Sequence, residues 1–229
     1  MRCKLFVFRH AETTDNARQL FSGWRDPRLT PKGLAQARET ADQLKNEAIH
    51  YAFTSHLQRA RHTLAIVLKP HSSIPIFTDD RLIERCYGLL QGKSKRRIEQ
   101  ERPHWYAKVH RGYDFPPPAG ESLKMVLDRT MPFLNELQQW LPENPGNVAI
   151  SCHGNSMRPI RKVFEHLSIK QMLQLENPQD QAMTYTLNCP QAHPKPPANP
   201  PMKDRWKGVH VPRAVKLATD PKNPLMQYY

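Results

Sequence analysis

Short apolar runs recur along the chain, and stretches with helical periodicity lie between them. Residues 4–9 (KLFVFR) and 147–152 (NVAISC) are predominantly apolar and too short for a helix, which predicts strands buried on both faces. The YAFT run at 51–54 predicts another strand, and residues 74–78 and 183–187 are two further strand candidates.

Four helices are predicted, three of them from the apolar spacing of an amphipathic helix. Thr30-Pro31 has the pattern of an N-cap followed by proline at the first helical position, and it predicts a helix that continues to about residue 46. Further helices are predicted over about 57–68 and 121–141, the latter kinked at Pro132, and from about residue 156. The alternation predicts a three-layer α/β sandwich with a mostly parallel central sheet flanked by helices.

The chain of 229 residues is long enough for one domain with an extension. Half of residues 190–201 are proline, a composition typical of linkers and tails. We therefore expect a folded domain over 1–189 and a Pro-rich, basic C-terminal tail over 190–229 that is extended or partly disordered.

A formal net charge of +13 points to an anionic partner, namely nucleic acid, an anionic membrane surface or a small anionic substrate. Residues 91–111 carry seven Lys/Arg against two Glu, and residues 190–229 carry seven Lys/Arg against two Asp. The first cluster is a candidate for substrate binding. The tail lacks a recognisable nucleic-acid-binding motif, so nucleic acid is not the expected partner.

No apolar run approaches the length of a membrane span, and the N-terminus lacks the apolar segment of a secretory signal. The four cysteines (Cys3, Cys86, Cys152 and Cys189) are widely spaced without a CxxC pair, which argues for reduced thiols and against a zinc site or a disulfide scaffold. We expect a cytoplasmic protein with no membrane partner.

Two of the predicted strands end in a histidine, His10 and His153. In open α/β sheets, ligands bind beyond the carboxyl ends of the strands, where helix N-termini favour anions. Arg9 precedes the first histidine, and Arg59 lies in the first turns of the helix after the YAFT strand. Two histidines, two arginines and two helix N-termini predict a phosphate pocket.

The motifs around these residues resemble one known family. RHAETTDN, FSGWRDPRLTPKG, TSHLQRARHT, RLIERCYGLLQGKSK, GESL and SCHGNSMR resemble the histidine phosphatase superfamily, and more narrowly its cofactor-dependent (2,3-bisphosphoglycerate) phosphoglycerate mutases. The resemblance covers roughly residues 4–167.

The resemblance implies that His10 is phosphorylated on its imidazole and that Arg9 and Arg59 hold the phosphoryl group. It also implies that His153 is the second histidine of the pocket and that Glu84 is the acid/base carboxylate. No metal is expected. The residues that it assigns to substrate binding are Thr13, Asn16, Ser22, Gly23, Tyr87, Lys95, His110, Arg111, Gly154 and Asn155.

The chain departs from the family pattern at several places. Ala11 replaces a glycine, His110-Arg111 stands for an Arg-Arg pair that grips the substrate carboxylate, and PQDQA at 178–182 replaces a Thr-Gly dipeptide. The insertion usual in many mutases before the ESL motif is absent. His110 can supply charge only when protonated, nominally below about pH 6.5.

Three functions remain open at this point. A phosphoglycerate mutase of glycolysis would interconvert 2- and 3-phosphoglycerate through phospho-His10, primed by 2,3-bisphosphoglycerate. A phosphomonoesterase would use the same chemistry with water as acceptor, and a non-catalytic basic protein would use its tail to contact nucleic acid. The mutase is the leading hypothesis, with a small anionic phosphorylated substrate as partner; the oligomeric state, including a homodimer, is left open.

Overall fold

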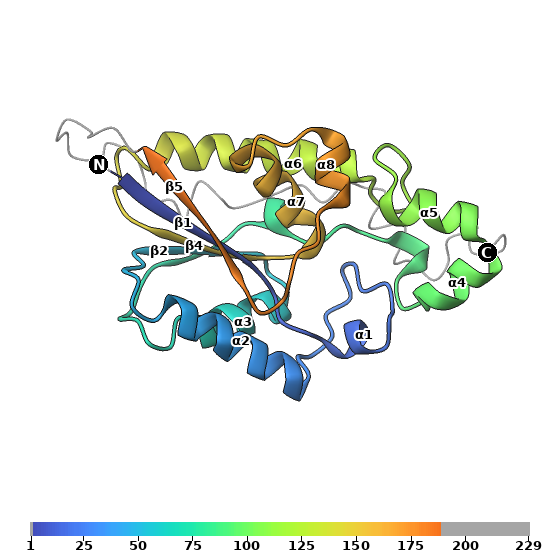
Figure 1. The fold of residues 1–229 in the computed structure, drawn as a ribbon, viewed down its shortest axis with the longest axis horizontal. Helices are drawn as coiled ribbons and strands as arrows, with labels where there is room; N and C mark the ends of the chain where they lie inside the picture. The colour runs from blue at the N-terminus through green and yellow to red at the C-terminus, as the bar shows by residue number, and fades with distance from the viewer. Residues whose placement is uncertain (1, 189–229) are drawn as a thin grey trace.

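A five-stranded sheet forms the centre of the protein in a computed structural model that describes residues 2–188 (Figure 1). The strand order is β3-β2-β4-β1-β5; β5 is antiparallel to β1, and the other neighbours are parallel. The mostly parallel sheet is therefore confirmed, whereas the predicted tail at 190–229 lies outside the described residues. The strands are β1 (Arg2–Arg9), β2 (Tyr51–Thr54), β3 (Ile76–Thr78), β4 (Val148–Cys152) and β5 (Ala182–Asn188).

Helices cover both faces of the sheet, as the three-layer prediction requires. In Figure 1, α2 (Pro31–Leu44) and α3 (Gln58–Val67) lie on one side, and α6 (Leu123–Trp140) and α7 (Gly154–Phe164) lie on the other. The shorter elements are α1 (Thr14–Ala17), the 3₁₀ turns η1 (Asp80–Leu82) and η2 (Gly88–Leu90), α4 (Lys95–Glu101), α5 (Pro103–Arg111) and α8 (Ile169–Gln174).

Strand β1 explains why its apolar run is uninterrupted. Leu5 and Val7 belong to the core under α6 and α7, whereas Phe6 and Phe8 belong to the core under α2 and α3. Successive side chains of a strand point to opposite faces, so a strand with helices on both sides needs apolar residues at every position.

The local signals place the main elements to within two residues. Thr30 accepts from the Gly33 backbone N–H at 2.9 Å with Pro31 at the start of α2, so the predicted N-cap is confirmed. Helix α7 begins at Gly154, two residues before the expected start, because His153 is already its N-cap. Helix α6 continues through Pro132.

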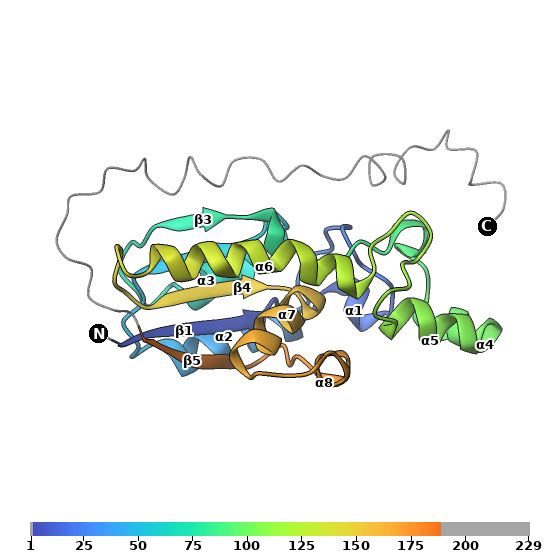
Figure 2. The same ribbon diagram turned by 90° about the horizontal axis from the view of Figure 1, so that it is seen from above.

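Helices α4 and α5 were not predicted from the sequence. They occupy most of the basic cluster at 91–111, whose charge obscures the apolar positions Ile98 and Val109 that the fold buries. Both helices lie beyond the carboxyl ends of the parallel strands (Figure 2), which brings their basic residues to the edge where His10 and His153 emerge.

The structure also bears on the membrane and thiol predictions. Within residues 2–188, no helix combines the length and apolar character that a bilayer span requires. Cys3, Cys86 and Cys152 are buried free thiols.

Candidate active site

His10 follows β1 directly and is buried at the edge of the sheet. Its backbone N–H donates to the carbonyl oxygen of Cys152 at 2.9 Å, which ties the end of β1 to the end of β4. The ring Nδ1 lies 2.8 Å from the carbonyl oxygen of Ala11, and Nε2 lies 3.2 Å from Nε of Arg59. Because a carbonyl only accepts and a guanidinium only donates, Nδ1 carries the proton and Nε2 is the basic nitrogen.

Electrostatics keep this imidazole neutral. Burial, followed by the positive charges of Arg59 and Arg9, holds the pKa of His10 well below its usual range. A neutral ring with an unprotonated Nε2 is competent as a nucleophile at neutral pH.

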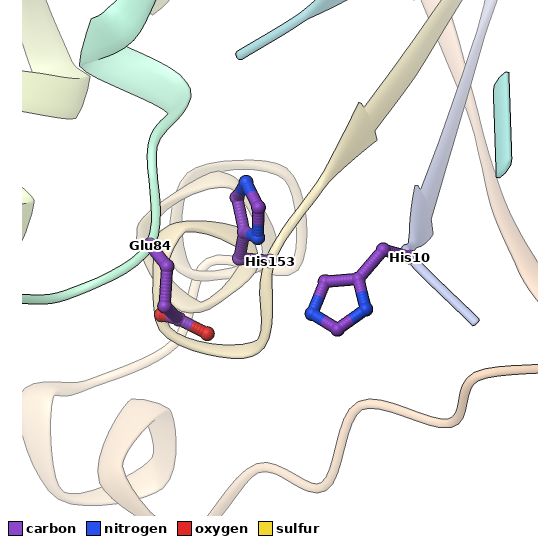
Figure 3. A group of neighbouring side chains, drawn as sticks. All are labelled: His10, Glu84 and His153. Atoms are coloured by element: carbon purple, nitrogen blue, oxygen red, sulfur yellow. The ribbon is translucent and has the colours of Figure 1, made fainter. Parts of the chain in front are cut away.

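His153 lies beside His10, with ring centroids 5.1 Å apart, and Figure 3 shows the two rings next to each other. Its Nε2 lies 2.7 Å from Oγ of Ser55, whereas its Nδ1 is buried without a hydrogen-bond partner among residues 2–188. Burial, then the positive charge of Arg59, holds the pKa of His153 well below its usual range. When the Ser55 hydroxyl donates to Nε2, Nδ1 carries the proton and is a free donor.

Glu84 approaches the two histidines from the loop between η1 and η2, and its carboxyl end is turned toward His10 (Figure 3). One oxygen, Oε1, accepts from the backbone N–H of Arg85 at 2.7 Å and from the backbone and side-chain nitrogens of Asn155 at 3.2 and 3.0 Å. Three donors on Oε1 leave Oε2 as the oxygen that can carry and transfer a proton.

Arg9 and Arg59 bring two guanidinium groups to the side of His10. Arg59 is buried and Arg9 is half-buried. Arg59 is fixed by donation to the carbonyl oxygens of Arg25 and Gly23 at 2.6 and 2.8 Å. Nε of Arg9 and Oγ of Ser22 are buried without a hydrogen-bond partner within the described chain. Unpaired buried donors beside two positive charges define a site for an anion such as a phosphoryl group.

A cavity of about 250 Å³ connects His10, Glu84 and the two arginines to the basic residues of α4 and α5. The predicted His153 does not line this cavity; it is fully buried beside His10. Of the predicted substrate-binding residues, Thr13 does not line this cavity; it is fully buried and caps α1. The predicted residues that do line it are Arg9, His10, Asn16, Ser22, Gly23, Arg59, Glu84, Tyr87, Lys95, His110, Arg111, Gly154 and Asn155.

The surroundings lower the pKa of two of these cavity residues, His110 and Lys95. Burial, followed by the charges of Lys95 and Arg111, lowers the pKa of His110 to about 4. This histidine therefore stays neutral as the pH falls from 7 to well below 6.5. The nominal titration near pH 6.5 is therefore moved to lower pH by the surroundings of His110. Burial and the charge of Arg9 also lower the pKa of Lys95, whose ammonium lies 5.7 Å from the ring centroid of Phe21.

Several residues that line the cavity or contact the residues around it escaped the sequence analysis. Gln179, in the PQDQA segment, donates from Nε2 to the carbonyl oxygen of His10 at 3.2 Å and to Oδ1 of Asn16 at 3.1 Å. Ser55 follows β2 as the histidines follow β1 and β4, and that position was the signal for it. The residues that line the cavity itself and were not predicted are Gln19, Leu20, Tyr106, Arg158, Glu176 and Asn177.

The backbone accommodates Ala11 without strain. Ala11 is fully buried and is not among the residues of 2–188 with positive φ, so its conformation does not require glycine. Its N–H donates to Oγ1 of Thr63 at 3.1 Å, and its carbonyl oxygen holds the His10 tautomer.

His10, Glu84 and His153 could also be considered as metal ligands, because one donor atom from each lies within 4.8 Å of the others. Arg59, however, donates to His10 Nε2, and Arg9 lines the same cavity. Two guanidinium groups in the same cavity repel a cation, so the charge of the site favours an anion.

A second cavity, of about 590 Å³, lies against α4 and α5 and is lined by residues such as Leu90, Ile98 and Trp105. Its lining includes no histidine or cysteine. Although this second cavity is larger, His10, Glu84, Arg9 and Arg59 all line the smaller cavity, which is therefore the candidate active site.

Solved structures share this fold. The structure of mycobacterial hydrolase 1 aligns with a TM-score of 0.72 at 22% identity, covering 81% of this chain and 92% of that one. A phosphoglycerate mutase from Bacillus anthracis aligns with a TM-score of 0.68 at 18% identity, covering 83% and 90%. At these identities the likeness concerns the fold alone.

Relatives with similar sequences identify the family to which the chain belongs. The chain is 39% identical over 195 residues to the 2,3-bisphosphoglycerate-dependent phosphoglycerate mutase of Nitrobacter winogradskyi, covering 81% of this chain and 92% of the relative. The family model of the histidine phosphatase superfamily (branch 1) matches residues 5–195. With its strand-end histidines and arginines in one anion site, the chain belongs to the histidine phosphatase superfamily, an enzyme superfamily.

Proposed function

We propose that the protein is a phosphoglycerate mutase that interconverts 2- and 3-phosphoglycerate through a phosphohistidine on His10. The observation that carries this proposal is one cavity with two cationic parts. Arg9 and Arg59 flank the nucleophile, and Lys95 and Arg111 line the same cavity. A ligand with a phosphate and a second anionic group, such as phosphoglycerate, matches both parts.

The first step would be priming by 2,3-bisphosphoglycerate. Nε2 of His10 attacks phosphorus, the Nε2–P bond forms as the P–O bond breaks, and the electron pair stays on the glycerate oxygen. Glu84 supplies the proton to that oxygen through Oε2. Arg9, Arg59 and the Nδ1–H of His153 would hold the phosphoryl oxygens, since phosphoryl transfer depends mainly on positioning and charge neutralisation.

The reverse step would complete the mutase cycle. A hydroxyl of the bound phosphoglycerate attacks phospho-His10, the Nε2–P bond breaks, and Glu84 accepts the hydroxyl proton. Because the acceptor carbon decides between the 2- and 3-isomers, the glycerate must turn within the cavity while it stays bound. Lys95 and Arg111 would retain it through its carboxylate, with His110 as a neutral neighbour.

A phosphomonoesterase is the second candidate, and one observation favours it. Arg111 is engaged by Glu176, with Nη2 at 2.6 Å from Oε1, so its guanidinium is already paired with a carboxylate. A site that holds glycerate weakly admits water, and water would then take the phosphoryl group from His10.

The decisive experiment is incubation with 3-phosphoglycerate, with and without 2,3-bisphosphoglycerate. Formation of 2-phosphoglycerate that depends on the bisphosphate supports the mutase. Release of inorganic phosphate without 2-phosphoglycerate would overturn the mutase proposal and support the phosphatase.

A further inference from the structure

The guanidinium of Arg111 already holds a carboxylate of the protein itself. Nη2 of Arg111 donates to Oε1 of Glu176 at 2.6 Å. Nη1 donates to the carbonyl oxygens of Leu173 and Leu175 at 3.1 and 3.5 Å, at the end of α8. Backbone acceptors therefore orient Arg111, and Glu176 neutralises it.

Glu176 lies in the cavity that contains the nucleophile. Among the described residues that line this cavity, Glu84 is the only other carboxylate, and three hydrogen bonds from Arg85 and Asn155 engage one of its oxygens. Glu176 thus pairs with Arg111, the arginine that is proposed to bind the carboxylate of the substrate.

The backbone around Glu176 is anchored to the active site. The carbonyl oxygen of Glu176 accepts from Nη1 of Arg161 at 2.8 Å. Its neighbour Asn177 donates from Nδ2 to the carbonyl oxygen of Gly154 at 2.7 Å and accepts from Nη1 of Arg9 at 3.2 Å. The side chain of Glu176, in contrast, is 80% exposed, so it can turn away from Arg111 without moving the anchored backbone.

Because the Arg111–Glu176 pair is exposed, another carboxylate can easily replace Glu176 on Arg111. Arg111 is 37% exposed and Glu176 is 80% exposed, and ion pairs in water at such exposure typically change an equilibrium by roughly 1.5- to 5-fold. A substrate carboxylate offers Arg111 the same acceptor geometry. Nη1 is already engaged by two backbone carbonyls and Nη2 by Glu176, so a substrate carboxylate that forms two hydrogen bonds with Arg111 competes with Glu176, whose like charge also repels it.

We propose that Glu176 is a built-in competitor for the carboxylate subsite, holding Arg111 until a carboxylate-bearing phosphomonoester displaces it. By filling the subsite, Glu176 weakens the binding of phosphoglycerate and lets the cavity accept phosphomonoesters that have no carboxylate. This inference rests on the proposed function only in assigning Arg111 to the substrate carboxylate.

The test is calorimetric binding of 3-phosphoglycerate and of glycerol 3-phosphate to the full chain and its variants, at fixed ionic strength. Glu176→Gln should lower the Kd for 3-phosphoglycerate by roughly 2- to 5-fold and leave the Kd for glycerol 3-phosphate unchanged. In an Arg111→Ala background, Glu176→Gln should have no effect, because the competition acts through Arg111.

The matched control is Glu101→Gln, which removes an equally charged, exposed member of the Arg97–Glu101 pair on α4 and should change neither Kd. The proposal is overturned if Glu176→Gln leaves the Kd for 3-phosphoglycerate unchanged. It is also overturned if the gain persists without Arg111 or extends equally to glycerol 3-phosphate, since either result means general charge repulsion. Because binding needs no turnover, these outcomes are independent of whether 2-phosphoglycerate is formed.

Discussion

Oγ of Ser55 lies 2.7 Å from Nε2 of His153, and both residues are fully buried where β2 and β4 end. This contact determines which nitrogen of His153 is free. With the hydroxyl as donor to Nε2, the proton of the imidazole is on Nδ1. The Nδ1–H can then donate a hydrogen bond to an oxygen of the phosphoryl group that is transferred to His10.

Ser55→Ala should therefore slow phosphorylation of His10 by roughly tenfold, since it leaves a buried nitrogen unpaired at a cost of about 1–3 kcal/mol. Quenched-flow measurement of phosphoenzyme formation tests this. Ser94→Ala, which removes the N-cap hydroxyl of α4 outside this contact, is the control. An unchanged rate in Ser55→Ala would show that the hydroxyl does not set the state of His153.

His10→Ala should abolish turnover and the acid-labile phosphoenzyme together, because Nε2 is the nitrogen that the hydrogen bonds leave unprotonated. Labelling with a ³²P donor, followed by acid and base treatment, measures the phosphoenzyme. The exposed His104 on α5 supplies the control His104→Ala, which should label normally. Wild-type labelling of His10→Ala would remove His10 from this role.

Glu84→Gln should have an effect that depends on the leaving group. With 4-nitrophenyl phosphate as donor, phosphorylation of His10 should stay close to the wild-type rate, because this leaving group needs no proton. With 2,3-bisphosphoglycerate, transfer should slow by about 10²–10⁴-fold, the usual contribution of general acid catalysis. Equal losses with both donors would instead make Glu84 a structural or binding residue.

Stability should fall in acid, partly through His110. Its pKa is about 4 in the folded protein against 6.5 ordinarily, so below pH 6.5 the unfolded chain takes up a proton that the folded chain does not. The free energy of unfolding then decreases as pH falls, by about 1.4 kcal/mol per pH unit for one histidine, until the folded-state pKa is reached.

The corresponding variant is His110→Gln, which cannot titrate. Between pH 7 and pH 5, its free energy of unfolding should lose about 2 kcal/mol less than that of the wild type. Urea unfolding at the two pH values measures the difference, and His104→Gln on the same helix is the control. A parallel pH dependence in His110→Gln and the wild type would contradict the buried neutral state.

Much of the framework is determined by the sequence alone, because the relevant signals are local. The continuous apolar runs of β1 and β4 require cover on both faces, and this requirement predicts the layers before any contact is known. Thr30 caps the start of α2 through a hydrogen bond with Gly33, which is only three residues away in the sequence. Since parallel strands end at the same edge, the sequence also predicts that His10 and His153 lie together.

Only the tertiary structure decides what surrounds these groups. Ser55 reaches His153 across 98 residues, and Gln179 reaches His10 across 169, so no local pattern encodes either contact. The neutral state of His110 results from burial and from neighbouring charges, which depend on how α4 and α5 pack. For the same reason the pairing of Arg111 with Glu176, which neutralises one of the cavity's cations, is a property of the folded chain.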